Sequence, residues 1–322
     1  MTASESKTPS ATEPIVESAE PIPVDALTVD GSTSRGRLTG AFMKRGGTFS
    51  AAAMLVFLVL IIVAVLAPQW LASGDPTAST GTALTGPSSA NWFGTDDLGR
   101  DVFTRTIWGA RPILIASVIG ILISTVSGVA MGLIGGVAPP LVSGLIMRIL
   151  DVILALPALL IALMVVAIVG TGTTSVIVAV GVAYAPAFAR VVYGSVRRLR
   201  TADYISASRL FGGTGIHSVF RHLLPNLATE IAVLVSSAIG WTVLTAGTLS
   251  FLGFGVSLPS PDWGVDLASG GKYLETAWWM STFPGLAITA VILLSNFFGD
   301  YIGSALDPHS SVKAPRTAAM LH

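Results

Sequence analysis

Long stretches without any charged side chain are the feature that most limits what this chain can fold into. No charge occurs between Arg45 and Asp75, between Arg111 and Arg148, or from 152 to 189. A helix needs about 20 apolar residues to cross roughly 30 Å of hydrocarbon, and a charge at its centre is costly. Because 52% of the residues are hydrophobic and only 11% are charged, we predict an all-α polytopic membrane protein.

These stretches predict six transmembrane helices. The residues 170–174, Gly-Thr-Gly-Thr-Thr, form a predicted turn that divides the stretch from 152 to 189 into two spans. The other spans are expected at 49–67, 113–137, 227–251 and 283–303.

Small residues recur every four positions along the second span, at Gly120, Ser124, Gly128 and Gly132. They permit close approach of another helix. That helix could belong to this chain or to a partner subunit, or the small residues could line a substrate path.

The positions of lysine and arginine predict the orientation, because short loops rich in these residues stay on the cytoplasmic side. With a cytoplasmic amino terminus, fourteen of the eighteen Lys and Arg residues lie on that side, the exceptions being Arg100, Arg105, Arg111 and Lys272. Six spans place both termini on one side. We therefore predict cytoplasmic N- and C-termini.

The first 46 residues are rich in Ser, Thr, Pro and Glu and show no helical periodicity, which favours a disordered tail. Their acidic start is unlike a secretory signal peptide, so the first span is expected to be an uncleaved anchor. The predicted organisation is a disordered cytoplasmic tail (1–46), a first transmembrane helix with an extracytoplasmic segment (47–111), a core of five transmembrane helices (112–309) and a cytoplasmic tail (310–322).

A polar, basic loop at 203–226 lies between two hydrophobic spans, on the predicted cytoplasmic side. Thr201 or Asp203 can cap a short helix that ends at Gly212 and Gly213, where glycine allows the chain to reverse. A second helix is expected from about 214 to 223, and Pro225 should stop it before the next span. Residues at i, i+3, i+4 and i+7 share one face of each helix, namely Tyr204, Ala207, Ser208 and Phe211, then Ile216, Val219, Phe220 and Leu223. Such a loop could lie on the lipid surface or dock another protein.

The order of residues in this loop resembles the EAA loop of ABC-importer permeases, which contacts the ATPase subunit. The matching residues are Tyr204, Ala207, Gly212, Ile216, Phe220, Arg221, His222, Leu224, Pro225 and Asn226. The family's leading Glu is Ser206 here and the third position is Ser208, which removes a possible ion pair. The resemblance implies that ATPase coupling rests on Tyr204, Ser206, Ala207, Ser208, Phe211, Gly212, Gly213, Ile216, Phe220, Arg221, His222 and Pro225.

Further motifs resemble one branch of these permeases, the shorter C-type subunit of the dipeptide/oligopeptide/nickel family. They are Trp-Phe-Gly-Thr-Asp-Asp-Leu-Gly-Arg-Asp-Val at 92–102, Trp-Gly-Ala-Arg at 108–111, Met-Arg-Ile-Leu-Asp at 147–151 with Leu-Pro at 156–157, and Leu-Ser-Phe-Leu-Gly-Phe-Gly at 249–255 with Pro-Asp-Trp-Gly at 261–264. Pro284-Gly285, Asn296, Gly299-Asp300 and Leu306-Asp307-Pro308 extend the match, which covers about 91–309.

The resemblance implies a type I ABC importer permease fold in the cytoplasmic (inner) membrane. This chain and a homologous permease would form the pathway for di- or oligopeptides. Two ABC ATPase subunits would bind ATP and magnesium, and an extracytoplasmic solute-binding protein would deliver the substrate. Nickel or another solute is the alternative cargo within the family, and no substrate-binding residue is evident from the sequence.

No residue pattern in the chain indicates an enzyme or a cofactor site. The only Gly-Lys pair, Gly271-Lys272, has Asp266 and Tyr273 where a nucleotide-binding Walker A motif requires Gly and a hydroxyl residue. There are no cysteines, and the histidines at 217, 222, 309 and 322 lack the spacing of a metal site. Zero net charge gives no sign of a nucleic-acid partner.

Acidic residues near the predicted helix ends have structural interpretations. The cluster Asp96, Asp97 and Asp101 lies beside Arg100 and is expected to be a self-paired, capped helix start rather than a calcium loop. Asp151, Glu230 and Asp300 could relay protons or bind substrate. For Asp151 we expect pairing with Arg148 or with a partner subunit.

Two other classes compete with the importer: an ATP-independent secondary transporter and an intramembrane enzyme. A secondary transporter would usually show internal repeats and charged or broken sites at mid-membrane, and the sequence shows no convincing repeat. An intramembrane protease would need a nucleophile and base, or paired acids, within the spans, and the sequence shows no such set.

Overall fold

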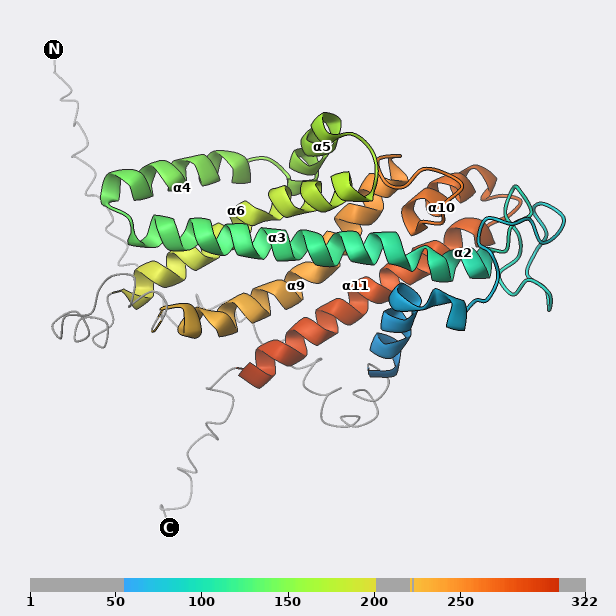
Figure 1. Cartoon of the computed structure of the whole chain (residues 1–322), viewed down its shortest axis with the longest axis horizontal. Helices are drawn as coiled ribbons and strands as arrows, with labels where there is room; N and C mark the ends of the chain where they lie inside the picture. Colours follow the sequence, from blue (N-terminus) through green and yellow to red (C-terminus); the bar gives the residue numbers. More distant parts are fainter. Residues whose placement is uncertain (1–54, 201–220, 222, 307–322) are drawn as a thin grey trace, which may run out of the picture. The chain divides into compact units, whose positions relative to one another are not determined.

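The computed structural model describes residues 55–200, 221 and 223–306. This part of the chain is helical and contains no β-strand. In chain order it comprises the helix Leu55–Leu66, η2 (Pro68–Trp70), α2 (Val102–Trp108), α3 (Ala110–Val137), α4 (Pro140–Leu154), α5 (Ala158–Val169), α6 (Thr173–Leu199), α9 (Leu224–Phe251), α10 (Trp263–Gly270), η4 (Gly271–Tyr273) and α11 (Trp279–Leu306) (Figure 1).

Among the described residues, four helical segments are long and apolar enough to cross a membrane: Val102–Val137, Thr173–Leu199, Leu224–Phe251 and Trp279–Gly299. The pair α4 and α5 passes the same criterion together, but bends by 92° at a short break. Counted over the described residues alone, the helix Leu55–Leu66 falls short of a full span. The multi-pass, all-α class is therefore confirmed, whereas the number of six spans stays a prediction.

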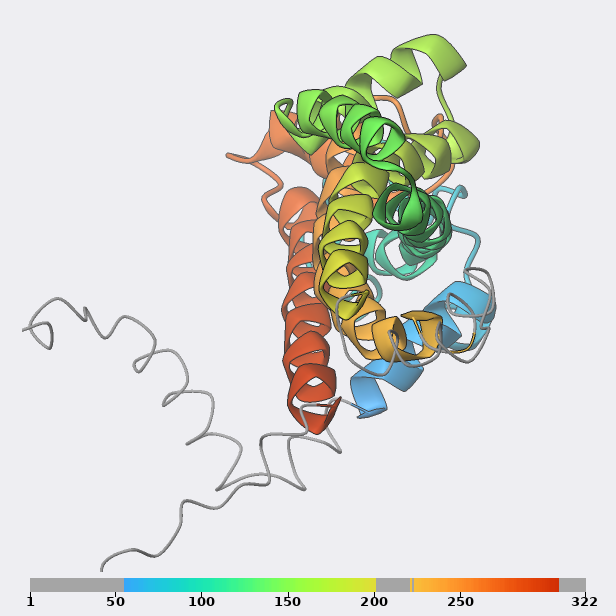
Figure 2. The same ribbon diagram turned by 90° about the vertical axis from the view of Figure 1, so that its left-hand side faces the viewer.

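The most extensive contact between two helices of the described part joins α3 and α6, which lie side by side in both views (Figures 1 and 2). Glycines make the close approach possible: a Cβ at Gly128 would lie 2.5 Å from the Cβ of Phe188, and one at Gly132 would lie 2.6 Å from the carbonyl oxygen of Ala189. The hydroxyl of Ser124 donates to the carbonyl of Gly181 at 2.9 Å. The small-residue face of α3 thus packs against α6 of the same chain, and this settles the alternatives that the sequence left open.

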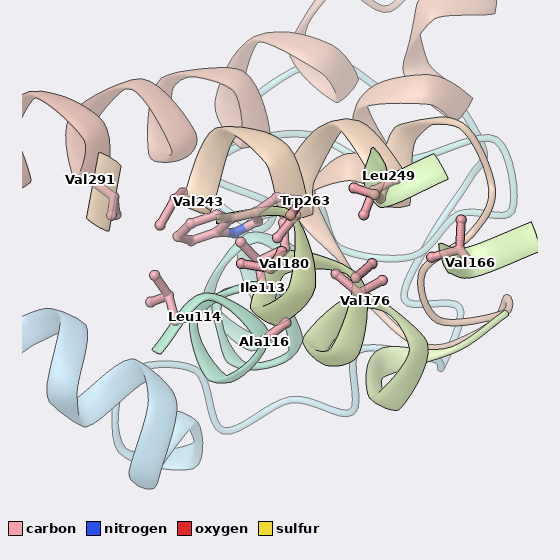
Figure 3. Packing of buried hydrophobic residues seen from close by; sticks show 14 of the residues in the cluster. Ile113, Leu114, Ala116, Val166, Val176, Val180, Val243, Leu249, Trp263 and Val291 are labelled. Carbon is pink, nitrogen blue, oxygen red and sulfur yellow. The ribbon is translucent and has the colours of Figure 1, made fainter. Parts of the chain in front are cut away.

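The main hydrophobic core joins the start of α3, the start of α6 and the end of α9 to α5 and α10. Figure 3 shows the side chains of Ile113, Val180 and Val243 around the ring of Trp263, which is 4% exposed. Because α10 is a short helix outside the long spans, burial of its Trp fixes the loop regions onto the helical bundle.

Two local predictions concern a turn and the end of a helix. The turn at 170–174 is confirmed, since α5 ends at Val169, α6 begins at Thr173, and Gly170 and Gly172 adopt positive φ values of 101° and 117°. The stop assigned to Pro225 stays a prediction, because most of the helix that it would end, at 214–223, lies outside the described residues. Pro225 lies in the first turn of α9, where its missing N–H group costs no helical hydrogen bond.

Candidate functional site

Most of the predicted coupling residues lie outside the described residues: Tyr204, Ser206, Ala207, Ser208, Phe211, Gly212, Gly213, Ile216, Phe220 and His222. Arg221 is exposed and Pro225 begins α9. The remaining histidines at 217, 309 and 322 also lie outside the described part. The structure does describe the two helix ends from which the loop departs.

Polar contacts tie three helices together at this loop base, which we define as the end of α3, the end of α6 and the start of α9. Arg198 of α6 forms an ion pair with Glu230 of α9. Arg200, the residue after α6, donates from Nη1 to the carbonyl oxygen of Gly136 on α3 at 2.6 Å. The loop therefore departs from a point where α3, α6 and α9 are joined.

Apolar packing reinforces the loop base. Val192 and Val196 of α6 form a buried cluster with Leu223 and Leu227 on the α9 side. A Cβ at Gly136 would lie 2.5 Å from Cγ1 of Val196, so the end of α3 is in contact with the same cluster. A force on the loop would reach all three helices, since close-packed side chains transmit strain.

A second concentration of polar contacts is the polar cap, which we define as residues 72–109 and 254–284. Its centre is Arg105 of α2, whose side chain is 3% exposed. Arg105 forms an ion pair with Asp266 of α10 and donates from Nη1 to the carbonyl oxygens of Pro76 at 3.0 Å and Pro259 at 3.1 Å. One guanidinium group thus connects three separate segments of the chain.

The acidic cluster before α2 is self-paired, as predicted. Nε of Arg100 lies 2.5 Å from Oδ2 of Asp96, and the backbone N–H group of Arg100 donates to Oδ1 of Asp96 at 2.9 Å. Asp101 caps α2 by accepting from the N–H group of Thr104 at 2.8 Å. The expected capped helix start is therefore confirmed.

Two tryptophans connect the halves of the polar cap. Nε1 of Trp263 donates to the carbonyl oxygen of Thr106 at 2.6 Å, and Nε1 of Trp279 donates to that of Thr95 at 3.0 Å. Gly94 has φ +75°, and a Cβ there would lie 2.7 Å from Nε1 of Trp279. The segments 94–106 and 263–279 therefore form one folded unit although they are distant in the sequence.

The loop base and α10 lie within a region of the chain that matches a known protein family. The family described as "Binding-protein-dependent transport system inner membrane component" matches residues 128–312, which include α6, the loop base, α9 and α10. The chain belongs to this family. It is thus the membrane-embedded permease component of an ABC transporter, a multi-pass membrane protein in which ATP hydrolysis is the task of separate subunits.

Curated relatives cover most of the permease. It is 35% identical to the dipeptide transport system permease protein DppC of Alkalihalophilus pseudofirmus, over 79% of this chain and 84% of that protein. It is 33% identical to the probable D,D-dipeptide transport system permease protein DdpC of Escherichia coli K12, over 86% and 94%, and 40% identical to the glutathione transport system permease protein GsiD of Shigella flexneri, over 79% and 84%.

A solved structure supports the fold. The inward-facing MetNI methionine ABC transporter superposes with a TM-score of 0.52 at 21% identity, covering 64% of the permease and 96% of that chain. The type I importer permease fold that the motifs imply is confirmed.

Two acids near helix ends have partners in the permease itself. Asp151 of α4 pairs with Arg190 of α6, and Glu230 pairs with Arg198. The predicted partner Arg148 is wrong, because packing of α4 against α6 brings Arg190 to Asp151. The side chain of Asp300 lies outside what the structure describes. Among the described residues, no three His, Cys, Asp or Glu side chains are grouped as metal ligands.

The sequence did not assign roles to Arg105, Asp262 and Asp266. Nε of Arg105 lies 3.7 Å from Oδ2 of Asp96, and Arg105 also pairs with Asp266, a residue 161 positions away. The available signal was the motif Pro-Asp-Trp-Gly at 261–264, whose Asp precedes an aromatic helix start and is a favoured N-cap.

Asp262 makes the stability of the polar cap depend on pH. It caps α10 by accepting from the Gly264 N–H group at 2.9 Å, and it accepts from the hydroxyl of Ser250 at 3.2 Å. Burial is the main cause that raises the pKa of Asp262 from its ordinary 3.8 to about 6, and the negative charge of Asp266 adds to it. Burial also raises the pKa of Asp266, opposed by Arg105.

Since the folded protein holds this proton more tightly than the unfolded chain, protonation stabilises the fold. The stabilisation is fully present below pH 3.8 and is lost as the pH rises through about 6. We expect the melting temperature of the detergent-solubilised permease to rise between pH 7 and pH 5 by more in the wild type than in Asp262→Asn. If the melting temperatures of the two proteins changed equally with pH, Asp262 would not be the group responsible for the pH dependence.

Proposed function

We propose that the permease forms half of the translocation pathway of an ATP-driven importer of di- and oligopeptides. The relatives named for dipeptide, D,D-dipeptide and glutathione transport support peptides as the substrate class. A homologous permease would supply the other half of the pathway. Two ATPase subunits would carry ATP and magnesium, and an extracytoplasmic solute-binding protein would deliver the peptide.

The loop 203–226 would couple this permease to the ATPases. The observation that carries this proposal is the loop base, where Arg198, Arg200 and the cluster around Val196 join α3, α6 and α9. An ATPase that moves the loop would therefore move three helices together. Ser206 and Ser208 leave shape and burial, rather than an ion pair with the ATPase, as the means of contact.

The proposed orientation places the loop base, both termini and the tails at 1–46 and 310–322 in the cytoplasm. The polar cap would then face the opposite side. This follows from the distribution of Lys and Arg. In this arrangement 47–111 holds the first span and an extracytoplasmic segment, and 112–309 the core.

Uptake by reconstituted vesicles tests the substrate. The complex of this permease with its second permease, ATPases and binding protein should accumulate a radiolabelled dipeptide only when ATP is supplied on the ATPase side. Radioactive nickel in the same assay is the competing cargo. ATP-driven uptake of nickel without dipeptide would replace the peptide proposal, and uptake of dipeptide without ATP would favour a secondary transporter.

The substitution Gly212→Pro tests the coupling loop, because proline lacks the positive φ and the N–H group that a reversal at glycine uses. In a pull-down through a tag on this permease, we expect about tenfold less ATPase, which corresponds to about 1.4 kcal/mol of docking free energy. Recovery of the second permease serves as the internal control for folding. Unchanged ATPase recovery together with normal uptake would remove the loop from the coupling mechanism.

A further inference from the structure

The break between α4 and α5 leaves backbone polar groups without partners. Leu154 ends α4, Ala158 begins α5, and the two helices meet at 92°. Within the described part of the chain, no hydrogen bond reaches the carbonyl oxygens of residues 154, 155 and 156 or comes from the N–H groups of Ala158 and Leu159. Pro157 at the break has no N–H group and so prevents the helix from continuing.

The break lies at membrane depth. Residues 140–154 rise about 22 Å at 1.5 Å per residue, alongside an α6 of about 40 Å. Asp151, one turn before the break, is held to Arg190 of α6, which lies about 14 Å from the end of that helix. Figure 1 shows α4 ending alongside the length of α6, and α5 standing between this point and the end at which α6 begins.

One face of α4 carries two charged side chains. Arg148, Asp151 and Ala155 follow one another at i, i+3 and i+7, which places them on one side of the helix. Their side chains are exposed in this chain, as are Leu156 and Pro157 at the break. Leu141, Leu145 and Ile149 form an exposed apolar stripe on α4 that borders this face and is suited to lipid.

Free backbone groups at this depth exclude contact with lipid tails. Each unsatisfied N–H or carbonyl group in hydrocarbon costs several kcal/mol, so irregular backbone occurs in membranes only where protein buries it or where it lines a water-filled space. In this chain the break is exposed. In the assembled transporter, either another subunit or a water-filled path must therefore cover it.

We propose that residues 154–159 and the Arg148–Asp151 face of α4 form part of the wall of the translocation path, and that the free carbonyl and N–H groups bind the main chain of the passing peptide. Every peptide carries the same N–H and carbonyl groups regardless of its side chains, so a backbone wall accepts many sequences. This inference rests on the proposed function for the identity of the substrate. The water-lined wall itself does not depend on that identity.

Cysteine labelling tests the wall, and the absence of native cysteines means that each variant carries one thiol. Ala155→Cys and Leu156→Cys place a thiol at the break. Val126→Cys on α3 is the matched control, because Val126 is 71% exposed and lies about 17 Å from the end of a regular helix. Each variant complex is first checked for assembly and for peptide uptake.

A membrane-impermeant methanethiosulfonate reagent should modify the thiols at 155 and 156 at least about tenfold faster than the thiol at 126, because a thiol in hydrocarbon lacks the reactive thiolate. Saturating trialanine with ATP should slow modification at 155 and 156 by a similar factor and leave 126 unchanged. Equal and slow labelling at all three positions would show that the break does not line a water-filled path. Fast labelling that trialanine does not change would show that the break does not contact the peptide. If the unmodified complex takes up no peptide, the proposed function fails, while labelling without peptide still decides whether the break faces water.

Discussion

Replacing Arg105 by alanine is expected to destabilise the permease by about 3–5 kcal/mol, the cost of breaking a buried ion pair by removing one partner. Asp266 would keep a buried carboxylate whose Oδ2 already lacks a hydrogen bond among the described residues. The carbonyl groups of Pro76 and Pro259 would lose their donor at the same time. Thermal or denaturant unfolding of the complex in detergent measures the loss.

Two variants make this prediction specific. Arg111→Ala removes an exposed arginine at the start of α3 and should change stability by less than about 1 kcal/mol. Adding Asp266→Asn to Arg105→Ala removes the unpaired charge and should recover part of the stability. A single variant as stable as Arg111→Ala, or a double variant no better than the single one, would show that Arg105 does not hold the polar cap together.

Replacing Gly128 by alanine is expected to cost about 1–3 kcal/mol, the usual effect of inserting a methyl group into a close-packed interface. The new Cβ would lie 2.5 Å from Cβ of Phe188 and 2.7 Å from the carbonyl oxygen of Ala185. Both atoms belong to or sit next to the α6 backbone, so a side-chain rotation would not relieve the overlap. The helices α3 and α6 would have to separate.

Gly194→Ala is the matched control, because Gly194 is also a helical glycine but no atom lies within 4 Å of an added Cβ. There alanine should stabilise the helix by roughly 0.5–1 kcal/mol, since glycine loses more backbone entropy on folding. Melting temperatures of the two variant complexes should therefore move in opposite directions. Parallel changes would mean that the contact between α3 and α6 tolerates separation.

The polar cap shows where prediction from the sequence ended. The sequence predicted that Asp96 and Arg100 pair, because they are four residues apart and a local turn suffices to join them. The pairing of Arg105 with Asp266, the capping of α10 by Asp262 and the burial of Trp263 were not predicted, since they depend on how α2 and α10 pack. The candidate coupling residues at 204–222 stay predictions, apart from the exposed position of Arg221.

The sequence by itself determined that this is a helical membrane protein, roughly where its helices lie, and to which family of permeases it belongs. These properties depend on hydrophobic stretches, glycine turns and short motifs, which are local. Only the tertiary structure decided that Gly120, Gly128 and Gly132 face α6, that Asp151 pairs with Arg190, and that α4 and α5 meet at a right-angled break with free backbone groups. The physical reason is that helix contacts depend on which faces meet in three dimensions, and residues far apart in the chain supply those faces.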